Sequence, residues 1–344
     1  MPALCGVDLE HPVMNAAGTG KSLEDVSELA RSATAAVMVG SITVAARTGN
    51  SGATYHAGDG FSLNALGLPN RGLDYYREHL PAMAALAHDA GKPLVLSIAG
   101  FSVEDYAQAA AAAASTGVDL LELNLACPNV WDGGAQKRIA CFDPGQTAAI
   151  CAAVDDVLRA APTRIPYGVK ISPFSDPEAL AGLADVLTKL ATGTTGTIGA
   201  ADGTGTTSGA GATSGNGAGR GGPRYVCSAN TFPNALAFDD AGRPVIGVGL
   251  AGLAGPALRP VALGQVRQLR RLLPTDVEIV GAGGVTNGRD VADFLRAGAS
   301  AVQIATAYWS RDGDPAVFGE IAADWAETSD PELWRMSRPI DKLS

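Results

Sequence analysis

Eight short apolar runs, each followed by an amphipathic segment, dominate the pattern of this sequence. The runs are rich in β-branched residues and occupy positions 12–18, 35–43, 93–100, 120–125, 167–172, 225–231, 278–285 and 301–307. The helices that follow them are predicted to begin near Ser22, Tyr75, Val103, Thr147, Pro177, Ala262, Gly288 and Pro315. Repeated strand–helix pairs predict parallel strands, and eight of them predict a closed (β/α)8 TIM barrel. A doubly wound sheet would show fewer units and one glycine fingerprint in its first turn.

Length and composition fit one such barrel over residues 1–344, with 47% hydrophobic and 17% charged residues. No apolar run reaches the roughly 20 residues that a membrane helix requires, so we expect no membrane partner. The N-terminal stretch MPALCGVDLEHP lacks the features of a secretory signal, which predicts a cytoplasmic protein. The formal net charge of −10 would repel nucleic acid, so no nucleic-acid partner is expected.

The cysteines and histidines predict neither a disulfide framework nor a metal site. The five cysteines are widely spaced and form no CxxC pair, which is typical of reduced thiols. The four histidines show no HxxxH spacing. We therefore expect no structural metal.

One segment interrupts the alternation of strands and helices. Residues 192–222 are nearly all Gly, Thr, Ser and Ala, a composition that cannot form a packed element. The segment lies between the fifth helix and the sixth strand, so in a barrel it leaves from the N-terminal face, away from the active-site face. We interpret it as a flexible insertion without a catalytic part. The alternative, a phosphate-binding loop, would be short and would directly precede a helix.

Polar side chains gather where the predicted strands end, and in a barrel these ends converge on one mouth. They are Asn64, Asn124, Cys127, Asn129, Lys170, Asn230 and Thr231. Asparagine amides both donate and accept hydrogen bonds, so several together would suit a flat ring with alternating C=O and N–H groups, such as a pyrimidine. Taken singly, each asparagine could instead cap a helix or close a turn.

Glycine-rich turns follow the last two strands, in GAGGVTNGRD and near IATA. Barrels often bind phosphate there through backbone N–H groups, which predicts a phosphate-bearing cofactor; tight turns that need glycine are the alternative. Lys170 ends the fifth strand, where its charge would suit the electron-rich end of a reduced flavin, although it could also extend to the rim.

These motifs resemble those of the class 1 dihydroorotate dehydrogenases, the soluble FMN enzymes of pyrimidine synthesis. The resemblance covers almost the whole chain outside the insertion. It is carried by MNAAG at 14, LNALGLPN at 63, SIAG at 97, ELNLACPN at 122, GVKIS at 168, SANT at 228, GAGGV at 281 and QIATA at 303. The membrane-bound class 2 enzymes have serine where this chain has Cys127.

The resemblance implies an FMN-containing barrel that oxidises dihydroorotate to orotate. It implies that Cys127 takes a proton from C5 of the substrate while C6 passes a hydride to flavin N5. The substrate-binding residues that it implies are Asn64, Leu66, Gly67, Leu68, Asn124, Asn129, Asn230 and Thr231. The implied FMN-binding residues are Ala16, Ala17, Gly18, Asn124, Lys170, Gly255, Gly283, Gly284, Ala305 and Thr306.

Three positions depart from the family pattern. Gly40 stands where the family has a lysine, Thr54 aligns with an arginine, and another family lysine aligns near Val245. Arg47 matches a family arginine, and Arg71 or Lys137 could compensate from loops. Loss of a paired cation can weaken binding of a buried carboxylate by about 2–5 kcal/mol, enough to change substrate preference. An FMN oxidoreductase of the same family that acts on a less anionic ring is therefore the alternative function.

A barrel that only binds a ligand is a third interpretation, which the intact Cys127, Lys170 and asparagine set weigh against. As partners we expect a small-molecule substrate and a second copy in a homodimer. Some class 1 enzymes reduce fumarate, whereas others pass electrons to NAD through a second subunit. The layout of CPNVWDGG and SIAGFSVEDY favours the fumarate type, so a partner subunit is not favoured.

Overall fold

A barrel of eight parallel strands forms the centre of the protein. The computed structural model describes residues 2–127, 130–132, 135–194 and 221–328. The barrel strands are β3 (Val13–Asn15), β4 (Val37–Ile42), β7 (Leu94–Ile98), β8 (Leu120–Asn124), β11 (Tyr167–Ile171), β12 (Tyr225–Ser228), β15 (Glu278–Ala282) and β16 (Ala301–Ile304). From β4 to β16 each strand pairs with the next barrel strand along the chain, and β16 returns to pair with β3. All eight predicted strands are confirmed.

The ring closes between β3 and β4 through side chains as well as backbone. The Ala35 N–H donates to the carbonyl of Val13 at 2.9 Å. The buried amide of Asn15 then imitates a backbone partner, because its Nδ2 donates to the Met38 carbonyl at 2.9 Å and its Oδ1 accepts from the Met38 N–H at 2.8 Å. This junction distinguishes the fold from an open, doubly wound sheet.

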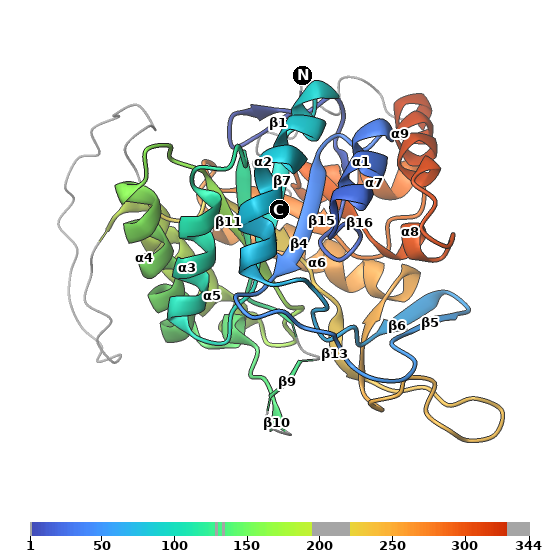
Figure 1. Cartoon of the computed structure of the whole chain (residues 1–344). Coiled ribbons are helices and arrows are strands. Elements are labelled where there is room, and N and C mark those ends of the chain that lie inside the picture. The colour runs from blue at the N-terminus through green and yellow to red at the C-terminus, as the bar shows by residue number, and fades with distance from the viewer. Residues whose placement is uncertain (1, 128–129, 133–134, 195–220, 329–344) are drawn as a thin grey trace.

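Helices cover the outside of the barrel (Figure 1). They are α1 (Leu23–Arg31), α2 (Leu73–Asp89), α3 (Val103–Ala113), α4 (Pro144–Ala160), α5 (Pro177–Thr192), α6 (Arg259–Leu272), α7 (Gly288–Ala297), α8 (Thr306–Trp309) and α9 (Ala316–Thr328). Short 3-10 helices span Ala140–Phe142 and Pro256–Leu258. Asp176 caps α5, because its carboxylate accepts from the Glu178 N–H at 2.9 Å, and the helix starts at Pro177 as predicted. The predicted starts of α2, α4 and α6 were two or three residues late.

Opposite ends of the barrel carry different additions. The N-terminal hairpin of β1 (Ala3–Leu4) and β2 (Val7–Asp8) packs Leu4 and Leu9 against interior residues such as Met14 and Met38. At the other end, β5 (Tyr55–Gly58), β6 (Phe61–Asn64), β13 (Phe232–Ala235) and β14 (Ala251–Ala254) form an antiparallel sheet. A hairpin of β9 (Trp131–Asp132) and β10 (Ala135–Gln136) lies at that end too (Figure 1). None of these strands was predicted, because each has only two to four residues and lacks the apolar run that marks the barrel strands.

The described flanks of the insertion lie at the N-terminal end of the barrel. After α5 ends at Thr192, the chain re-enters where the Arg224 N–H donates to the Tyr167 carbonyl at 2.7 Å, at the start of β11. The chain thus leaves from the expected face. Residues 195–220 and 329–344 lie outside the described residues, so the single domain over 1–344 and the flexible character of the insertion stay predictions.

Candidate active site

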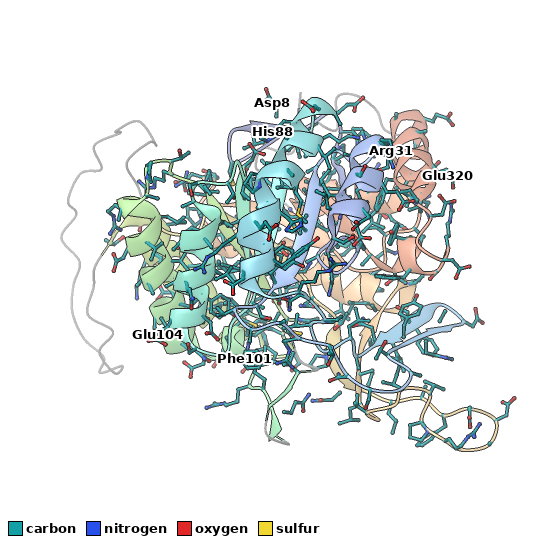
Figure 2. The ribbon with its side chains drawn as sticks, in the orientation of Figure 1. Asp8, Arg31, His88, Phe101, Glu104 and Glu320 are labelled. Carbon is teal, nitrogen blue, oxygen red and sulfur yellow. The ribbon has the colours of Figure 1, made fainter. Side chains whose placement is uncertain are left out.

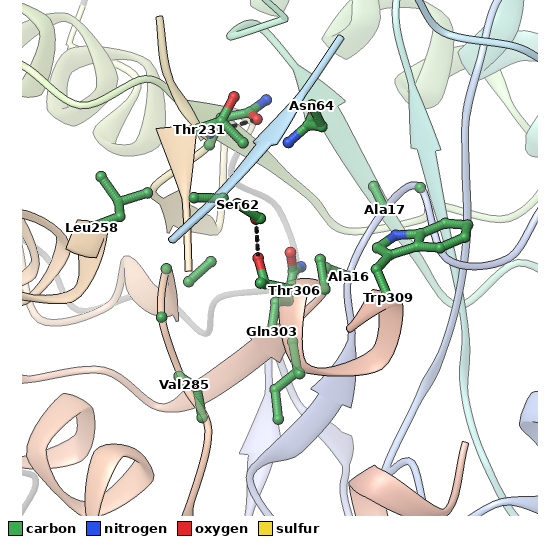
Figure 3. Close-up of a pocket in the computed structure, with 18 of the residues that line it drawn as sticks. Ala16, Ala17, Ser62, Asn64, Thr231, Leu258, Val285, Gln303, Thr306 and Trp309 are labelled. Atoms are coloured by element: carbon green, nitrogen blue, oxygen red, sulfur yellow. Dashed lines mark hydrogen bonds between the residues drawn. The ribbon is translucent and has the colours of Figure 1, made fainter. Parts of the chain in front are cut away.

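Two connected cavities open at the C-terminal ends of the barrel strands. Their volumes are about 540 Å³ and about 90 Å³. Figure 3 shows the larger one between the ends of the barrel strands and the antiparallel sheet. Seven residues line both cavities, namely Ala17, Gly18, Asn64, Leu66, Lys170, Asn230 and Thr231. The two cavities therefore adjoin each other along these shared residues.

A buried charged network forms the floor of the larger cavity. Lys170, at the end of β11, donates from Nζ to Gln303 Oε1 at 2.6 Å. Gln303 in turn donates from Nε2 to Glu122 Oε2 at 2.7 Å, and the other Glu122 oxygen lies 3.7 Å from the Lys170 ammonium. Burial acts to lower the pKa of Lys170, but Cys227 and Glu122 outweigh it and the pKa lies above the usual lysine value. A permanent positive charge therefore stands at this end of the cavity.

Closely approaching backbone shapes another wall of the larger cavity. Gly283 and Gly284 follow β15 with φ of +122° and +78°, a region that side chains disfavour. A Cβ atom on Gly284 would lie 2.6 Å from the Gly255 carbonyl oxygen. Nearby, the hydroxyls of Ser62 and Thr306 lie 3.2 Å apart, drawn as a dashed line in Figure 3. Helix α8 begins at Thr306, and the first N–H groups of a helix lack intrahelical acceptors. This wall therefore offers hydrogen-bond donors to an anion.

The smaller cavity joins a half-buried thiol to a network of amides. Cys127 lines it just beyond β8. The Asn124 amide donates to the Ser41 hydroxyl at 2.8 Å and accepts from Asn230 Nδ2 at 3.2 Å. The Asn230 Oδ1 accepts from the Thr231 N–H at 2.8 Å. These bonds fix how the amides face the cavity, so a planar ring would meet a preorganised polar edge.

Cations surround the thiol on two sides. Lys21 lines the smaller cavity, and its pKa is lowered to about 8 by burial, which the charges of Cys127 and Asp25 partly offset. On the loop side, Lys137 and Arg47 lie over the Phe101 ring, with the Lys137 Nζ 5.2 Å and the Arg47 Cζ 4.8 Å from its centroid. Burial lowers the pKa of Lys137 as well, and the Cys127 charge opposes that effect. Both ammonium groups thus favour the thiolate form of the cysteine.

Figure 2 places Phe101 at the site end of the molecule, opposite Asp8 and His88. Arg71 lies instead over the Tyr75 ring, with its Cζ 4.7 Å from the centroid, and it does not line either cavity. Of the two compensating cations that the sequence analysis named, only Lys137 therefore approaches the cysteine.

Of the three positions that depart from the family pattern, two lie at or next to the cavities and the third lies away from them. Gly40 lies within β4, next to Ser41, with φ of +116°, and Thr54 lines the larger cavity. Val245 lies elsewhere, in a small apolar cluster with Ile246 and Leu63 under the antiparallel sheet. Within the described residues, the changes at Gly40 and Thr54 are thus the ones near the candidate ligand.

The structure brings together nearly all the residues named from the sequence. Sixteen line one cavity or both: Ala16, Ala17, Gly18, Asn64, Leu66, Gly67, Leu68, Asn124, Cys127, Lys170, Asn230, Thr231, Gly283, Gly284, Ala305 and Thr306. Gly255 lies behind Gly284 rather than in the lining. Asn129 lies outside the described residues.

Sequence reasoning missed several lining residues, among them Lys21, Ser41, Tyr55, Ser62, Gln303 and Trp309. Tyr55 and Trp309 belong to β5 and α8, elements that were not predicted. Lys21 lies in the loop after the first strand, and its place at the cavity depends on the backbone pairing of that loop with Gly40, which no signal in the sequence marks.

The described residues were also checked for disulfides, metal sites and membrane-spanning helices. Their five cysteines are all free, and no group of three His, Cys, Asp or Glu side chains could hold a metal ion. In that same part of the chain, no helix has the length and apolar character needed to cross a membrane. The expected absence of a metal stays a prediction.

Fold and site together define a barrel enzyme with a cofactor-sized cavity next to a thiol. A family model described as dihydroorotate dehydrogenase matches residues 2–222 and 216–327. The chain therefore belongs to the dihydroorotate dehydrogenase family, which is a family of oxidoreductases that act on a CH–CH bond.

Relatives of two types are similar to the chain. The catalytic subunit of dihydroorotate dehydrogenase B (NAD(+)) from Staphylococcus carnosus is 30% identical over 92% of this chain and 88% of that protein. Dihydroorotate dehydrogenase A (fumarate) from Lacticaseibacillus paracasei is 31% identical over 93% of this chain and 96% of that protein. The class 1 resemblance is thereby confirmed, whereas the two identities do not separate the fumarate type from the NAD type.

A solved structure gives the same fold. DHODH from Eimeria tenella, in complex with ferulenol, superposes with a TM-score of 0.71 at 21% identity, over 94% of this chain and 82% of that one. This likeness confirms the predicted barrel.

Proposed function

We propose that the protein oxidises dihydroorotate to orotate in pyrimidine synthesis, with FMN as its bound cofactor. The observation that carries the proposal is the connection between a cavity of about 540 Å³ and a smaller one that holds Cys127 and fixed amides. The first has the size of common cofactor sites, and the second suits a flat ring with polar edges. Relatives named dihydroorotate dehydrogenase support the choice of ring.

The residues present fit FMN. Glycine backbone at Gly283 and Gly284 leaves space that a Cβ atom would fill, and donors near Thr306 suit the phosphate. Ala17 would lie along the ring system, with Lys170 at its pyrimidine end. FMN, when bound, supplies the two-electron acceptor for the hydride that leaves C6 of the substrate.

Cys127 performs the proton transfer in this proposal. Its thiolate removes the C5 proton and becomes the neutral thiol, so that loss of a proton from C5 and a hydride from C6 leaves the C5=C6 double bond of orotate. Lys21 and Lys137 favour the thiolate before the step. Asn124 and Asn230, held by their mutual hydrogen bond, keep C5 facing the sulfur. General-base catalysis of this kind contributes about 10²–10⁴-fold in rate.

Single-turnover reduction of the flavin by L-dihydroorotate tests this role. In a Cys127→Ala variant the flavin stays bound, and its reduction should slow by about 10²-fold or more. Cys151→Ala is the matched control: that buried thiol, whose pKa burial raises to about 12, lies outside both cavities, and its rate should stay at wild type. Equal rates in the Cys127 variant and the wild type would refute the proposed role of Cys127.

A second candidate is oxidation of a less anionic cyclic substrate. Gly40 and Thr54 favour it, since both are uncharged where the resemblance implies cations. Flavin reduction by dihydrouracil, which lacks the carboxylate of dihydroorotate, distinguishes the two candidates. Faster reduction by dihydrouracil would favour the second.

We also propose a cytoplasmic homodimer without an electron-transfer subunit. The relative named for fumarate supports an acceptor that needs no second subunit, while the NAD-type relative, named a catalytic subunit, supports the alternative. Sedimentation of the purified protein tests the dimer, and turnover with fumarate against NAD tests the acceptor.

A further inference from the structure

Glu122 is a fully buried carboxylate beneath the floor of the larger cavity. It belongs to β8, in which all five residues are buried, and its side chain has no exposed surface. Its Oε2 accepts from the Gln303 amide at 2.7 Å. Its Oε1 has no hydrogen-bond partner among the described residues and lies 3.7 Å from the Lys170 ammonium, which is too far for a hydrogen bond. A carboxylate that is buried and only half satisfied calls for an explanation.

Gln303 holds the carboxylate and the ammonium in one arrangement. Its Oε1 accepts from Lys170 Nζ at 2.6 Å and from the Cys227 thiol at 3.3 Å, while its Nε2 donates to Glu122. Two donors on one side and an acceptor on the other therefore fix the orientation of the amide. Lys170 and Gln303 line the larger cavity, whereas Glu122 does not. The carboxylate can thus affect a ligand in the cavity only through its charge and through these two side chains.

The arrangement places a negative charge directly behind the positive charge that faces the cavity. Charges interact strongly in a buried, poorly solvated site. Two-electron reduction of a flavin adds negative charge near its pyrimidine end, and protein charges placed there tune that reduction. Lys170 would favour the added charge, and Glu122 would oppose it. Stability alone does not explain such a pair, because apolar residues of similar volume are often as stabilising as a buried ion pair.

We propose that Glu122 is a positioning residue that keeps the reduction potential of bound FMN low by offsetting the charge of Lys170 from behind. This inference rests on the proposed cofactor. In this role the carboxylate exchanges no electron and no proton. Two electrons enter the flavin from the substrate and leave to the acceptor, and a lower potential favours their departure. Glu122 thereby sets the balance between the two halves of the reaction.

The midpoint potential of the protein-bound FMN tests the inference. It is measured by anaerobic titration with a chemical reductant and a reference dye at about pH 6, because low pH keeps Lys170 protonated without its counter-charge. In Glu122→Gln, reduction should become more favourable by at least about tenfold, which is a rise of about 30 mV for a two-electron couple. Lys170→Met should shift the potential in the opposite direction. Glu122→Asp, which keeps the charge, should stay within about threefold of wild type.

Asp185→Asn is the matched control, because it also converts an acid to its amide but removes an exposed carboxylate on the surface of α5. Its potential should equal that of the wild type. Glu122→Ala serves as a second variant if the Gln variant does not fold, since water can occupy the space beside the ammonium. The potential should rise in that variant too.

An unchanged or lower potential after removal of the Glu122 charge would overturn the inference and make the pair with Lys170 structural. Equal shifts in Glu122→Gln and Asp185→Asn would also overturn it. Purified protein that retains no FMN would overturn the inference together with the proposed cofactor. Protein that retains FMN but is not reduced by dihydroorotate would refute only the proposed substrate, because the potentials are measured with a chemical reductant and would still decide the role of Glu122.

Discussion

Replacing Glu122 by glutamine tests the buried charges beneath the site. The Glu122 side chain is fully buried and that of Lys170 is 6% exposed, with 3.7 Å between the ammonium and the nearer oxygen. Glutamine keeps an acceptor for Gln303 but leaves the ammonium without its counter-charge. Breaking a buried pair in this way costs about 3–5 kcal/mol, so the free energy of unfolding should fall by that amount.

A double-mutant cycle isolates the interaction from other effects. Lys170→Met alone leaves a buried carboxylate and should cost a similar amount, whereas the double variant leaves no charge and should cost no more than the larger single change. Asp185→Asn is the exposed control: its pair with Lys189, at 2.7 Å on the surface of α5, should contribute less than about 0.5 kcal/mol.

Urea unfolding of flavin-free protein, followed by circular dichroism at neutral pH, measures these differences without a contribution from cofactor affinity. Two results together would refute the assigned role of the Glu122–Lys170 pair: each single change lowers the free energy of unfolding by less than about 1 kcal/mol, and the two losses add in the double variant. The reason is that the charges of a buried pair must couple.

Two further predictions concern the cavity walls. Gly284→Ala should weaken FMN binding at least about tenfold and lower the free energy of unfolding by about 1–3 kcal/mol, because the new Cβ would meet the Gly255 carbonyl oxygen at 2.6 Å with φ at +78°. Gly182→Ala, in helix α5 with open space around its Cβ, should leave FMN affinity unchanged and stabilise the protein by up to about 1 kcal/mol; equal effects at both positions would contradict this account of the glycine turn. The Kd for orotate should rise with pH, by up to about tenfold per pH unit, because Lys21 lines the cavity and attracts an anion only while it is protonated; without the Cys127 charge, which raises the pKa of Lys21, this rise should begin below pH 8. The titration is measured in a Cys127→Ser background, where the facing thiol no longer ionises and Asp25 is the remaining charge near Lys21; a flat profile up to pH 10 would be inconsistent with this role.

The barrel could be predicted from sequence because its signal is repeated and local. Each strand is an apolar run, and each helix has an apolar face and a start signal such as Asp176–Pro177. Strands β5, β6, β13 and β14 have no repeated apolar run, and the pairing of β6 with β14 joins segments nearly 200 residues apart. The β5–β6 hairpin did carry a local signal, the Asp59–Gly60 turn between its strands, which the strand prediction did not use. Their stability comes from tertiary contacts rather than from local preference.

The site was predictable where residues follow barrel strands and was missed where a loop supplies them. Cys127, Lys170 and Asn230 end strands, so their convergence follows from topology alone. Lys21 reaches the cavity only because its loop pairs with Gly40, a backbone contact that the sequence does not reveal. The apparent loss of a cation at position 40 therefore pointed to a less anionic substrate as the alternative, whereas the structure places Lys21 in the lining of the smaller cavity.

The visible spectrum of the purified protein, recorded without oxygen before and after addition of L-dihydroorotate, tests the central proposal most directly. We expect a flavin band that bleaches on addition, with orotate formed in equal amount to the flavin reduced. A flavin band that persists with L-dihydroorotate, or a protein that retains no flavin, would contradict the proposed function.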